Sequence, residues 1–253
     1  MDTLSDLQKE VIRKSHIKAK IHTNNLRHMI INKFIDNNID VKYIDIIVDY
    51  IKNKSYVTTM IPITTRYGMV KNIFDIFIEN PKLKNVFEVL NNNTVSLSIR
   101  KEVEDLLFFK MYNNCDNKER PKYGSINIVE NIVGDRLCKV YGDICLKYKN
   151  DIKKRTTFTF GDSFGKMLYI CTYESLEHIL YHFDINTIKI IIDIINGDNT
   201  KNIGQYIEAQ IHGNIDITQD IDNIRISKDK YDNNKVIIDK FIAKYPTIEI
   251  LVY

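Results

Sequence analysis

The chain has 253 residues, of which 44% are hydrophobic and 27% charged, and a formal net charge of +3. This composition can bury one large core or two small ones, and the small net charge argues against nucleic-acid or membrane-surface binding. No apolar run approaches the length of about 18 residues that a membrane helix needs. The opening MDTLSDLQKEVIRK lacks the basic start and apolar run of a signal peptide. We therefore expect a cytoplasmic protein, in a host cell if the source is viral.

The first part of the sequence, residues 1–112, is predicted to be mainly helical. Ser5 and Gln8 have the spacing of a capping box ahead of a long amphipathic pattern. That pattern ends at residues 37–38, and Asp40 can cap a second helix. Three further helices are expected, at about 70–80, 83–90 and 96–112.

Strand patterns dominate the second part, residues 113–253, although one strand is also expected at 55–65. Because that early stretch contains Pro62, it is predicted to lie at a sheet edge. Later strands are predicted at 125–129, 139–148, 156–160, 206–212, 223–227 and 247–253. Later helices are predicted at 173–183, 185–195 and 233–244.

Helices grouped early and strands grouped late predict an α+β fold, with a helical N-terminal half followed by a mixed or antiparallel sheet. The helical half, residues 1–112, is expected to form part of one domain or a helical subdomain. The β-rich core, residues 113–253, is expected to carry the functional site.

The stretch YIEAQIHG alternates between polar and apolar residues when it is read as a strand. One face then carries an acid, an amide and an imidazole, from Glu208, Gln210 and His212. A carboxylate held on a rigid strand beside other polar groups is a catalytic candidate. A solvent-exposed strand face explains the same alternation, and the alternation alone favours that simpler interpretation.

The block RPKYG precedes this strand in the chain. Pro121 fixes φ and Gly124 permits close backbone approach, so the loop could be held rigidly against a ligand. Arg120 could bind a phosphate or carboxylate, and Tyr123 could stack on a flat ring. An ordinary basic hairpin loop fits the block equally well.

The block TTFTFGDS, residues 156–163, ends in a turn sequence. Its hydroxyls and Asp162 could line a cleft at the end of a strand, but a strand followed by a simple turn is the favoured interpretation.

The histidines and cysteines do not form a recognisable metal motif, and we expect no metal. His178 and His182 share a helix face without the His-Glu-x-x-His order, so a solvated helix face is the favoured interpretation. The four cysteines form no CxxC pair and are expected to be reduced. They are Cys115, Cys138, Cys145 and Cys171.

Taken in order, these three blocks resemble a widespread, mainly bacterial family of unknown function. That family has an R-P-K-Y-G block, then R-T-T-F, an Asp-Ser turn and Y-I-E-A-Q-x-H-G, and the resemblance covers about residues 119–227. Such proteins also carry an earlier Tyr-Arg-x-Gln-Phe-Glu-Thr-Gly segment. Its counterpart here, SYVTTMIPITTRYG, keeps Tyr56 but has Val57 at the Arg position and lacks Glu-Thr-Gly.

The family pattern is in turn similar to the ADP-ribosyltransferase superfamily, which implies a fold of that kind and NAD as co-substrate. The resemblance assigns catalysis to Glu208, with Gln210 orienting the acceptor and His212 completing the set. It also implies that Arg66 or Arg120 grips NAD in place of the missing early Arg. The implied NAD-binding set is Arg120, Tyr123, Asn127, Thr157 and Ser163.

Three functions therefore stay open. The first is transfer of ADP-ribose from NAD, or use of another nucleotide-like molecule, with a protein, nucleic acid or small molecule as acceptor. The second is a non-enzymatic relative that binds a host, phage or other partner macromolecule, without any membrane partner. The third is another hydrolase or transferase that uses Glu208, His212 and Asp162 as acid and base, which needs its two carboxyl groups within about 5–10 Å.

Overall fold

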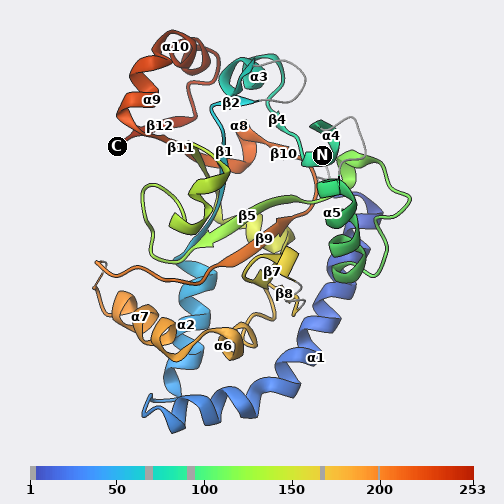
Figure 1. Ribbon diagram of the computed structural model, residues 1–253, viewed down its shortest axis with the longest axis vertical. Helices are drawn as coiled ribbons and strands as arrows, with labels where there is room; N and C mark the ends of the chain where they lie inside the picture. The colour runs from blue at the N-terminus through green and yellow to red at the C-terminus, as the bar shows by residue number, and fades with distance from the viewer. Residues whose placement is uncertain (1–3, 66–70, 90–94, 166–168, 199) are drawn as a thin grey trace.

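A computed structural model describes residues 4–65, 71–89, 95–165, 169–198 and 200–253. Helices come first and an eight-stranded mixed sheet runs through the middle of the molecule (Figure 1). The predicted α+β fold class is confirmed. In the described part of the chain, no helix is long and apolar enough to cross a membrane.

The elements of the described chain are as follows. The α-helices are α1 (Asp6–Asp36), α2 (Lys42–Asn53), α3 (Ile73–Glu79), α4 (Val86–Val89), α5 (Val95–Leu107), α6 (Ile179–His182), α7 (Ile185–Ile195), α8 (Ile217–Asp220), α9 (Lys228–Asn233) and α10 (Lys235–Lys244). The 3-10 helices are η1 (Asn117–Glu119), η2 (Arg136–Tyr141), η3 (Asn150–Arg155) and η4 (Ser163–Gly165). The strands of the main sheet are β1 (Tyr56–Ile61), β5 (Lys122–Asn127), β6 (Ile144–Tyr148), β7 (Thr156–Phe160), β8 (Cys171–Thr172), β9 (Ile207–Ile211), β11 (Ile221–Ile226) and β12 (Glu249–Val252). Two small ladders pair β4 (Lys82–Leu83) with β10 (Ile215–Asp216) and β2 (Thr64–Thr65) with β3 (Lys71–Asn72).

The first helix begins where its capping box predicts. The Ser5 hydroxyl accepts a hydrogen bond from the Gln8 backbone N–H at 3.3 Å, and the Gln8 side chain accepts one from the Ser5 N–H at 2.9 Å. The predicted helix at 173–183 is shorter in the structure, where only α6 remains. Its first residues form a turn instead, because Thr172 and Ser175 exchange two backbone hydrogen bonds.

The main sheet has the strand order β12-β11-β6-β1-β5-β9-β7-β8. The prediction of an edge strand at 55–65 is wrong, because β1 lies inside the sheet between β6 and β5. Pro62 does not interrupt the ladder, since the strand ends at Ile61. The helical first half and the β-rich second half therefore share one sheet.

The predicted strand at 139–148 is also shorter, because its first residues belong to η2. At Gly142 the chain passes so close to β1 that an added Cβ would lie 2.0 Å from the Ile61 carbonyl carbon. The strand β6 begins only after this crossing.

The two faces of the main sheet differ in chemistry. One face packs on α1, α2, α3, α6, α7 and α10 and forms the main hydrophobic cluster, with Leu146 and Ile224 among its strand residues. In Figure 1 the helices of this cluster lie at the two ends of the molecule, with α1, α2, α6 and α7 at one end and α3 and α10 at the other.

The opposite face is polar, because the ladders bring residues with polar side chains opposite one another. Strand pairing places the following residues on it: Asn223 and Arg225 of β11, Cys145 and Lys147 of β6, Tyr56 and Thr58 of β1, Tyr123, Ser125 and Asn127 of β5, Glu208 and Gln210 of β9, and Thr157 and Thr159 of β7. The helices and loops that cover this face determine what the site can do.

The sheet opens between its two central strands. Strands β1 and β5 form only three residue pairs, the last of which joins Thr58 to Ser125. Beyond that pair, β1 continues along β6 and β5 continues along β9. The Thr59 hydroxyl bridges the gap by donating to the Tyr123 carbonyl at 2.9 Å.

Candidate functional site

The polar side of β9 is buried. The side chain of Glu208 belongs to a residue that is 6% exposed, and Gln210 and His212 are fully buried. The interpretation of this pattern as a solvent-exposed strand face is wrong, because the segments after β7 and after α5 contact this face, through Ser163 at Glu208 and Tyr112 at His212. A carboxylate in this position must find partners inside the protein or on a ligand.

A chain of hydrogen bonds runs from Glu208 into the protein. The Gln210 amide donates to Glu208 Oε1 at 2.8 Å and to the Thr159 hydroxyl at 2.9 Å. The Thr157 hydroxyl lies 3.1 Å from Gln210 Oε1 and 3.0 Å from His212 Nε2. Three residues of the predicted site therefore form the network that holds Glu208 in place, namely Gln210, Thr157 and His212.

His212 is part of this support. Its Nδ1 lies 2.7 Å from the Tyr112 hydroxyl, and burial lowers the pKa of the imidazole to about 3. Both ring nitrogens are satisfied and the ring is neutral near pH 7. This arrangement fixes the ring and does not favour proton transfer by His212.

A cavity of about 190 Å³ lies next to Glu208, at the opening between β1 and β5. Its wall combines a carboxylate, a guanidinium, hydroxyls and aromatic rings. The lining residues are Thr58, Met60, Arg100, Tyr123, Gly124, Ser125, Cys138, Tyr141, Tyr206 and Glu208. A mostly concave site with a few convergent polar groups is typical of small-molecule binding. We call it the Glu208 cavity.

Several buried polar atoms around this cavity have no hydrogen-bond partner among the described residues. They are Thr58 Oγ1, Ser125 Oγ and Arg100 Nη1 in the lining, and Ser163 Oγ next to it. The Thr58 and Ser125 hydroxyls interact only weakly, with the thiols of Cys145 and Cys138. Buried polar atoms normally have partners, so this concentration at one place indicates a binding surface for a polar molecule.

The carboxyl group of Glu208 has a raised pKa, and burial is the largest cause. The nearby negative charge of Asp162 raises the pKa further, whereas Ser163, Gln210 and Arg100 lower it. Glu208 Oε2 accepts a 3.4 Å hydrogen bond from the Ser163 backbone N–H. Residues of the TTFTFGDS block therefore reach the same site as YIEAQIHG. A buried carboxyl group with a raised pKa at the wall of a cavity is a functional-site candidate.

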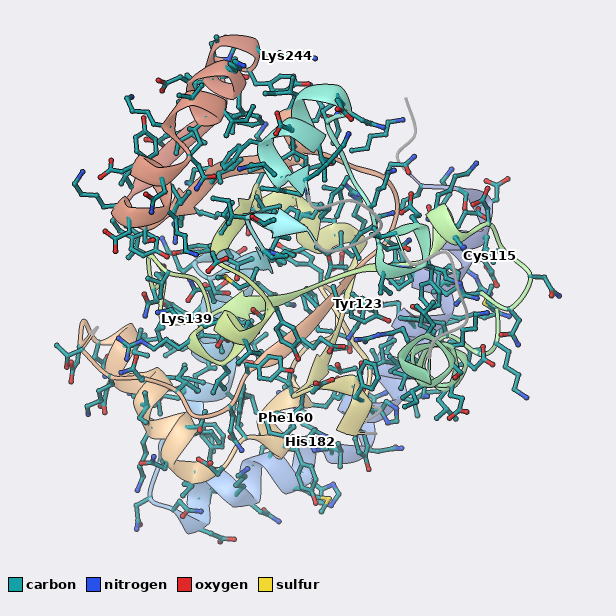
Figure 2. All side chains as sticks on the ribbon, turned by 45° about the horizontal axis from the view of Figure 1, so that its top comes forward. Cys115, Tyr123, Lys139, Phe160, His182 and Lys244 are labelled. Carbon is teal, nitrogen blue, oxygen red and sulfur yellow. The ribbon has the colours of Figure 1, made fainter. Side chains whose placement is uncertain are left out.

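Tyr123 lies near the centre of the molecule and lines the Glu208 cavity (Figure 2). Its hydroxyl donates to Glu104 at 3.0 Å, and the Arg100 guanidinium lies 4.0 Å from the ring centre. The predicted proximity of Tyr123 and Glu208 requires that their strands be neighbours. The ladder between β5 and β9 shows that they are.

Arg120 is engaged elsewhere. Its guanidinium forms a buried ion pair with Glu104 and donates to the Tyr112 carbonyl at 2.7 Å. Burial raises the pKa of Glu104 to about 7 in spite of the opposing Arg120 charge. The geometry gives Arg120 a role in joining α5 to β5. Arg66, the other predicted NAD grip, lies outside the described residues.

Two residues of α5 that were not predicted from the sequence also belong to the site. Arg100 lines the cavity and Glu104 holds Tyr123. A signal for both exists in the sequence, because Leu97, Arg100, Glu104 and Leu107 have the spacing of one helix face. Charged residues on an otherwise apolar stripe indicate buried, partnered charges.

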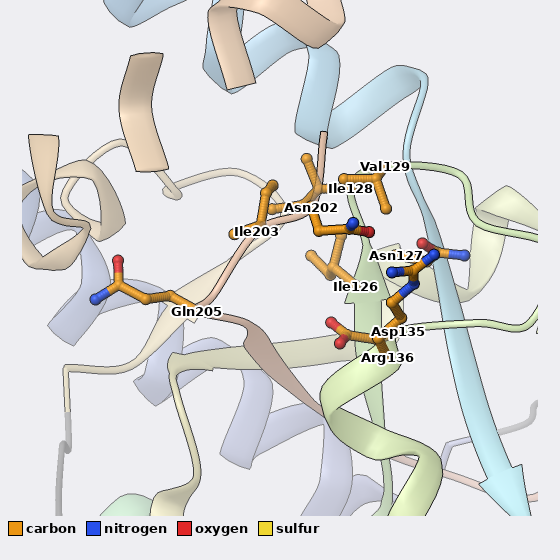
Figure 3. Close-up of a pocket in the computed structure, with 9 residues that line it drawn as sticks. All are labelled: Ile126, Asn127, Ile128, Val129, Asp135, Arg136, Asn202, Ile203 and Gln205. Atoms are coloured by element: carbon orange, nitrogen blue, oxygen red, sulfur yellow. The ribbon is translucent and has the colours of Figure 1, made fainter. Parts of the chain in front are cut away.

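Asn127 is not brought to Glu208. Its side chain holds a loop by exchanging hydrogen bonds with the Asn131 backbone, at 2.7 and 3.1 Å. It lines a separate hollow of about 20 Å³, which Figure 3 shows between β5 and the segment that carries Gln205. A volume of this size holds about one water molecule.

The histidine pair lies apart from the Glu208 cavity. The interpretation of His178 as solvated is wrong: it is fully buried, with Nδ1 2.9 Å from the Thr23 hydroxyl and Nε2 3.0 Å from the Ile170 carbonyl. His182 is half-buried and stacks on Phe160 (Figure 2). Within the residues that the structure describes, no group of three or more His, Cys, Asp or Glu side chains is arranged to hold a metal ion.

Comparison with known proteins agrees with the expected resemblance to an uncharacterised family. The model of the family described as "Protein of unknown function (DUF3626)" matches residues 65–183. This segment contains RPKYG and TTFTFGDS, and YIEAQIHG follows it in the chain. No curated protein matches the sequence.

Proposed function

We propose that this protein cleaves the bond between nicotinamide and ribose in NAD and transfers the ADP-ribose to an acceptor. The observation that carries the proposal is the buried Glu208 carboxylate at the wall of a cavity that also holds Tyr123 and unpartnered hydroxyls. Tyr123 suits the flat nicotinamide ring, the hydroxyls suit the free hydroxyls of the ribose, and the Glu208 carboxylate suits the positive charge that develops on it. The resemblance to ADP-ribosyltransferases that we expect from the sequence blocks points to the same chemistry.

In the proposed reaction, the bond between the pyridinium nitrogen and the ribose C1′ breaks. Its electron pair stays on nicotinamide, which leaves neutral, while positive charge develops on the ribose. The ionised Glu208 stabilises that charge from a fixed position. The acceptor then donates a lone pair to C1′ and loses a proton, so that ADP-ribose is joined to it.

The other residues of the site take supporting roles in this proposal. Tyr123, Tyr141 and Tyr206 offer aromatic surface to a nicotinamide ring. The hydroxyls of Thr58 and Ser125 are available to hydroxyl or amide groups of the substrate. Gln210 is fully buried and bonded to Glu208, so it orients the carboxylate and does not touch the acceptor.

The direct test is nicotinamide release from NAD, followed by chromatography, with labelled NAD and a cell lysate as the source of acceptors. Glu208→Gln keeps the shape of the side chain and removes its charge, and we expect a loss of about 10²- to 10³-fold in turnover. Glu249→Gln, an exposed Glu at the end of the sheet, is the matched control and should behave as wild type.

Each outcome of this test has a clear meaning. Absence of release by the wild type, or equal release by Glu208→Gln, contradicts the proposed activity. Tight binding of NAD, measured by calorimetry, would argue against the alternative that the protein is a non-enzymatic relative that binds a partner macromolecule.

A second candidate is hydrolysis of another glycosidic bond with Glu208 as general acid. It is favoured by one observation, the charge of Asp162 close enough to raise the Glu208 pKa. Two carboxyl groups close to one another are typical of such enzymes. The two candidates differ in the ionisation state that Glu208 needs, and the pH dependence of turnover therefore separates them.

A further inference from the structure

A second cavity, of about 240 Å³, lies on the other side of the same sheet opening. Residues of the opposite strand faces, Thr59 and Lys122, line it, and it shares Tyr123 and Arg100 with the Glu208 cavity. The remaining lining residues are Ile61, Leu83, Lys84, Asn85, Val86 and Phe164. The two cavities are thus neighbours that meet at two side chains.

The lining of the second cavity is positively charged. Among the described residues that line it are Lys84, Arg100 and Lys122, and none of these lining residues is acidic. The Lys122 ammonium is already used, since it donates to the carbonyls of Lys118 and Gly213 and lies 3.9 Å from Glu88. The charge offered to a ligand therefore comes from Arg100 and the exposed Lys84.

Arg100 is prepared to bind an anion. Its guanidinium is fixed between the rings of Tyr123 and Phe164, 4.0 and 3.9 Å from their centres. Its Nη1 atom is buried and has no hydrogen-bond partner in the described part of the chain. A planar, immobilised guanidinium with a free donor is the preferred partner of phosphate groups.

We propose that Arg100 and Lys84 bind the diphosphate of the substrate in the second cavity, while the glycosidic bond lies at Glu208 in the first. This inference rests on the proposed function and names the part that the sequence leaves unassigned, namely the group that grips the phosphates. The ligand class is a diphosphate-containing nucleotide. Arg100 sits where the two halves of such a molecule meet.

Binding of inorganic pyrophosphate and of ADP-ribose, measured by calorimetry, tests the anion site without any turnover. We expect Arg100→Gln to weaken both by about 10-fold or more, and Lys84→Gln to weaken both by a few-fold, as is usual for an exposed cation. Lys101→Gln, the exposed neighbour of Arg100 on α5, is the control and should bind as wild type. Failure of the wild type to bind either ligand at millimolar concentration, or equal binding by wild type and Arg100→Gln, overturns the proposal.

Arg100→Lys covers the case in which Arg100→Gln does not fold, as judged by thermal melting. This variant keeps the charge but loses the paired donors, and we expect binding between those of the wild type and Arg100→Gln. Wild-type affinity in both Arg100→Lys and Lys84→Gln contradicts the anion site.

Turnover of nicotinamide riboside, which lacks the diphosphate, separates this proposal from the proposed function. If both are correct, Arg100→Gln raises the KM for NAD by a larger factor than the KM for nicotinamide riboside, because Arg100 also lines the Glu208 cavity but only NAD carries the diphosphate. Pyrophosphate binding at Arg100 without cleavage of NAD keeps the anion site and removes the proposed function. Cleavage of NAD with an unchanged KM in Arg100→Gln supports the proposed function and contradicts the anion site.

Discussion

At the scale of single residues, Glu208 is defined by its burial. A carboxyl group that is mostly removed from water has a raised pKa, and here the Asp162 charge acts in the same direction. The hydrogen bonds from Ser163 and Gln210 favour the ionised form and keep the carboxylate aimed at the cavity. Glu208 is therefore protonated at a higher pH than an ordinary glutamate.

The pH dependence of kcat/KM for NAD follows from this shift. If Glu208 stabilises positive charge as a carboxylate, activity is full above its pKa and falls as the pH drops through it. The acid limb should lie above pH 4.5, the ordinary value for Glu, because the free-enzyme pKa is raised. A pH–rate profile of the wild type measures the limb. Activity that instead falls as the pH rises identifies Glu208 as a general acid and favours the second candidate.

Arg120 gives a second prediction at this scale. Its ion pair with Glu104 is buried, so Arg120→Met leaves an uncompensated carboxylate and should lower the free energy of unfolding by about 3–5 kcal/mol. Denaturant unfolding measures the loss, and the double variant Glu104→Leu with Arg120→Met should regain much of it. An Arg120→Met protein of unchanged stability that binds NAD weakly would instead support the ligand role expected from the sequence.

At the scale of elements, the opening between β1 and β5 creates the site. Gly124 lies at the point where the two strands part, and an added Cβ would lie 2.4 Å from the Thr58 carbonyl oxygen. The close approach of the backbones, and not an unusual φ angle, requires glycine there. The helix α5 then delivers Arg100 and Glu104 to the opening, and Tyr123 connects the two.

Gly124→Ala should push β1 and β5 apart. We expect it to lower the free energy of unfolding by about 1–3 kcal/mol, the usual cost of overpacking, and to weaken ligand binding because both cavities adjoin this point. Gly204→Ala is the control, since nothing lies within 4 Å of its added Cβ. Denaturant unfolding of both variants checks the prediction, and equal stability would mean that the strands can relax without loss.

At the scale of the whole molecule, buried histidines make the fold sensitive to acid. Burial lowers the pKa of His212 to about 3 and that of His178 to about 4, so both stay neutral in the folded protein. In the unfolded chain they take up protons as the pH falls below about 6.5. The contribution of these two imidazoles to stability is therefore complete above that pH and is lost as the pH falls from about 6.5 towards their folded-state pKa values.

The expected slope is about 1.4 kcal/mol per pH unit for each of these two histidines. Denaturant unfolding between pH 7.5 and 5 measures it. Because the pKa of the buried Glu104 is raised to about 7, this carboxyl group contributes a slope of the opposite sign over the same range, and the test is therefore a comparison of two proteins. His212→Asn should reduce the slope relative to the wild type, and an equal slope in the two proteins would contradict the assignment of a neutral, buried His212.

The sequence predicts local structure well where the signal is local. The capping box at Ser5, the alternation of YIEAQIHG and the early grouping of helices all lead to the right elements and fold class. The local sequence pattern does not show which distant segments pair with one another. The position of β1 inside the sheet depends on pairing with β5 and β6, which are more than sixty residues away in the chain.

The candidate site divides in the same way. Tyr123, Thr157, Ser163, Glu208, Gln210 and His212 come together as the strand order dictates. The burial of their polar face could not be predicted, because the period of a strand does not say what covers it. Arg100, and not the predicted Arg120, lines the Glu208 cavity, since only the packing of α5 decides which arginine is already paired.

The short ladder between the two central strands has a mechanical consequence. Three residue pairs are the fewest between any two interior neighbours of the main sheet. We therefore expect this seam between β1 and β5 to be the most flexible part of the sheet. A ligand that occupies both cavities would contact β1 and β5 together and hold them in place. We expect such a ligand to make the sheet more rigid, and the protein without ligand to be most flexible at this seam.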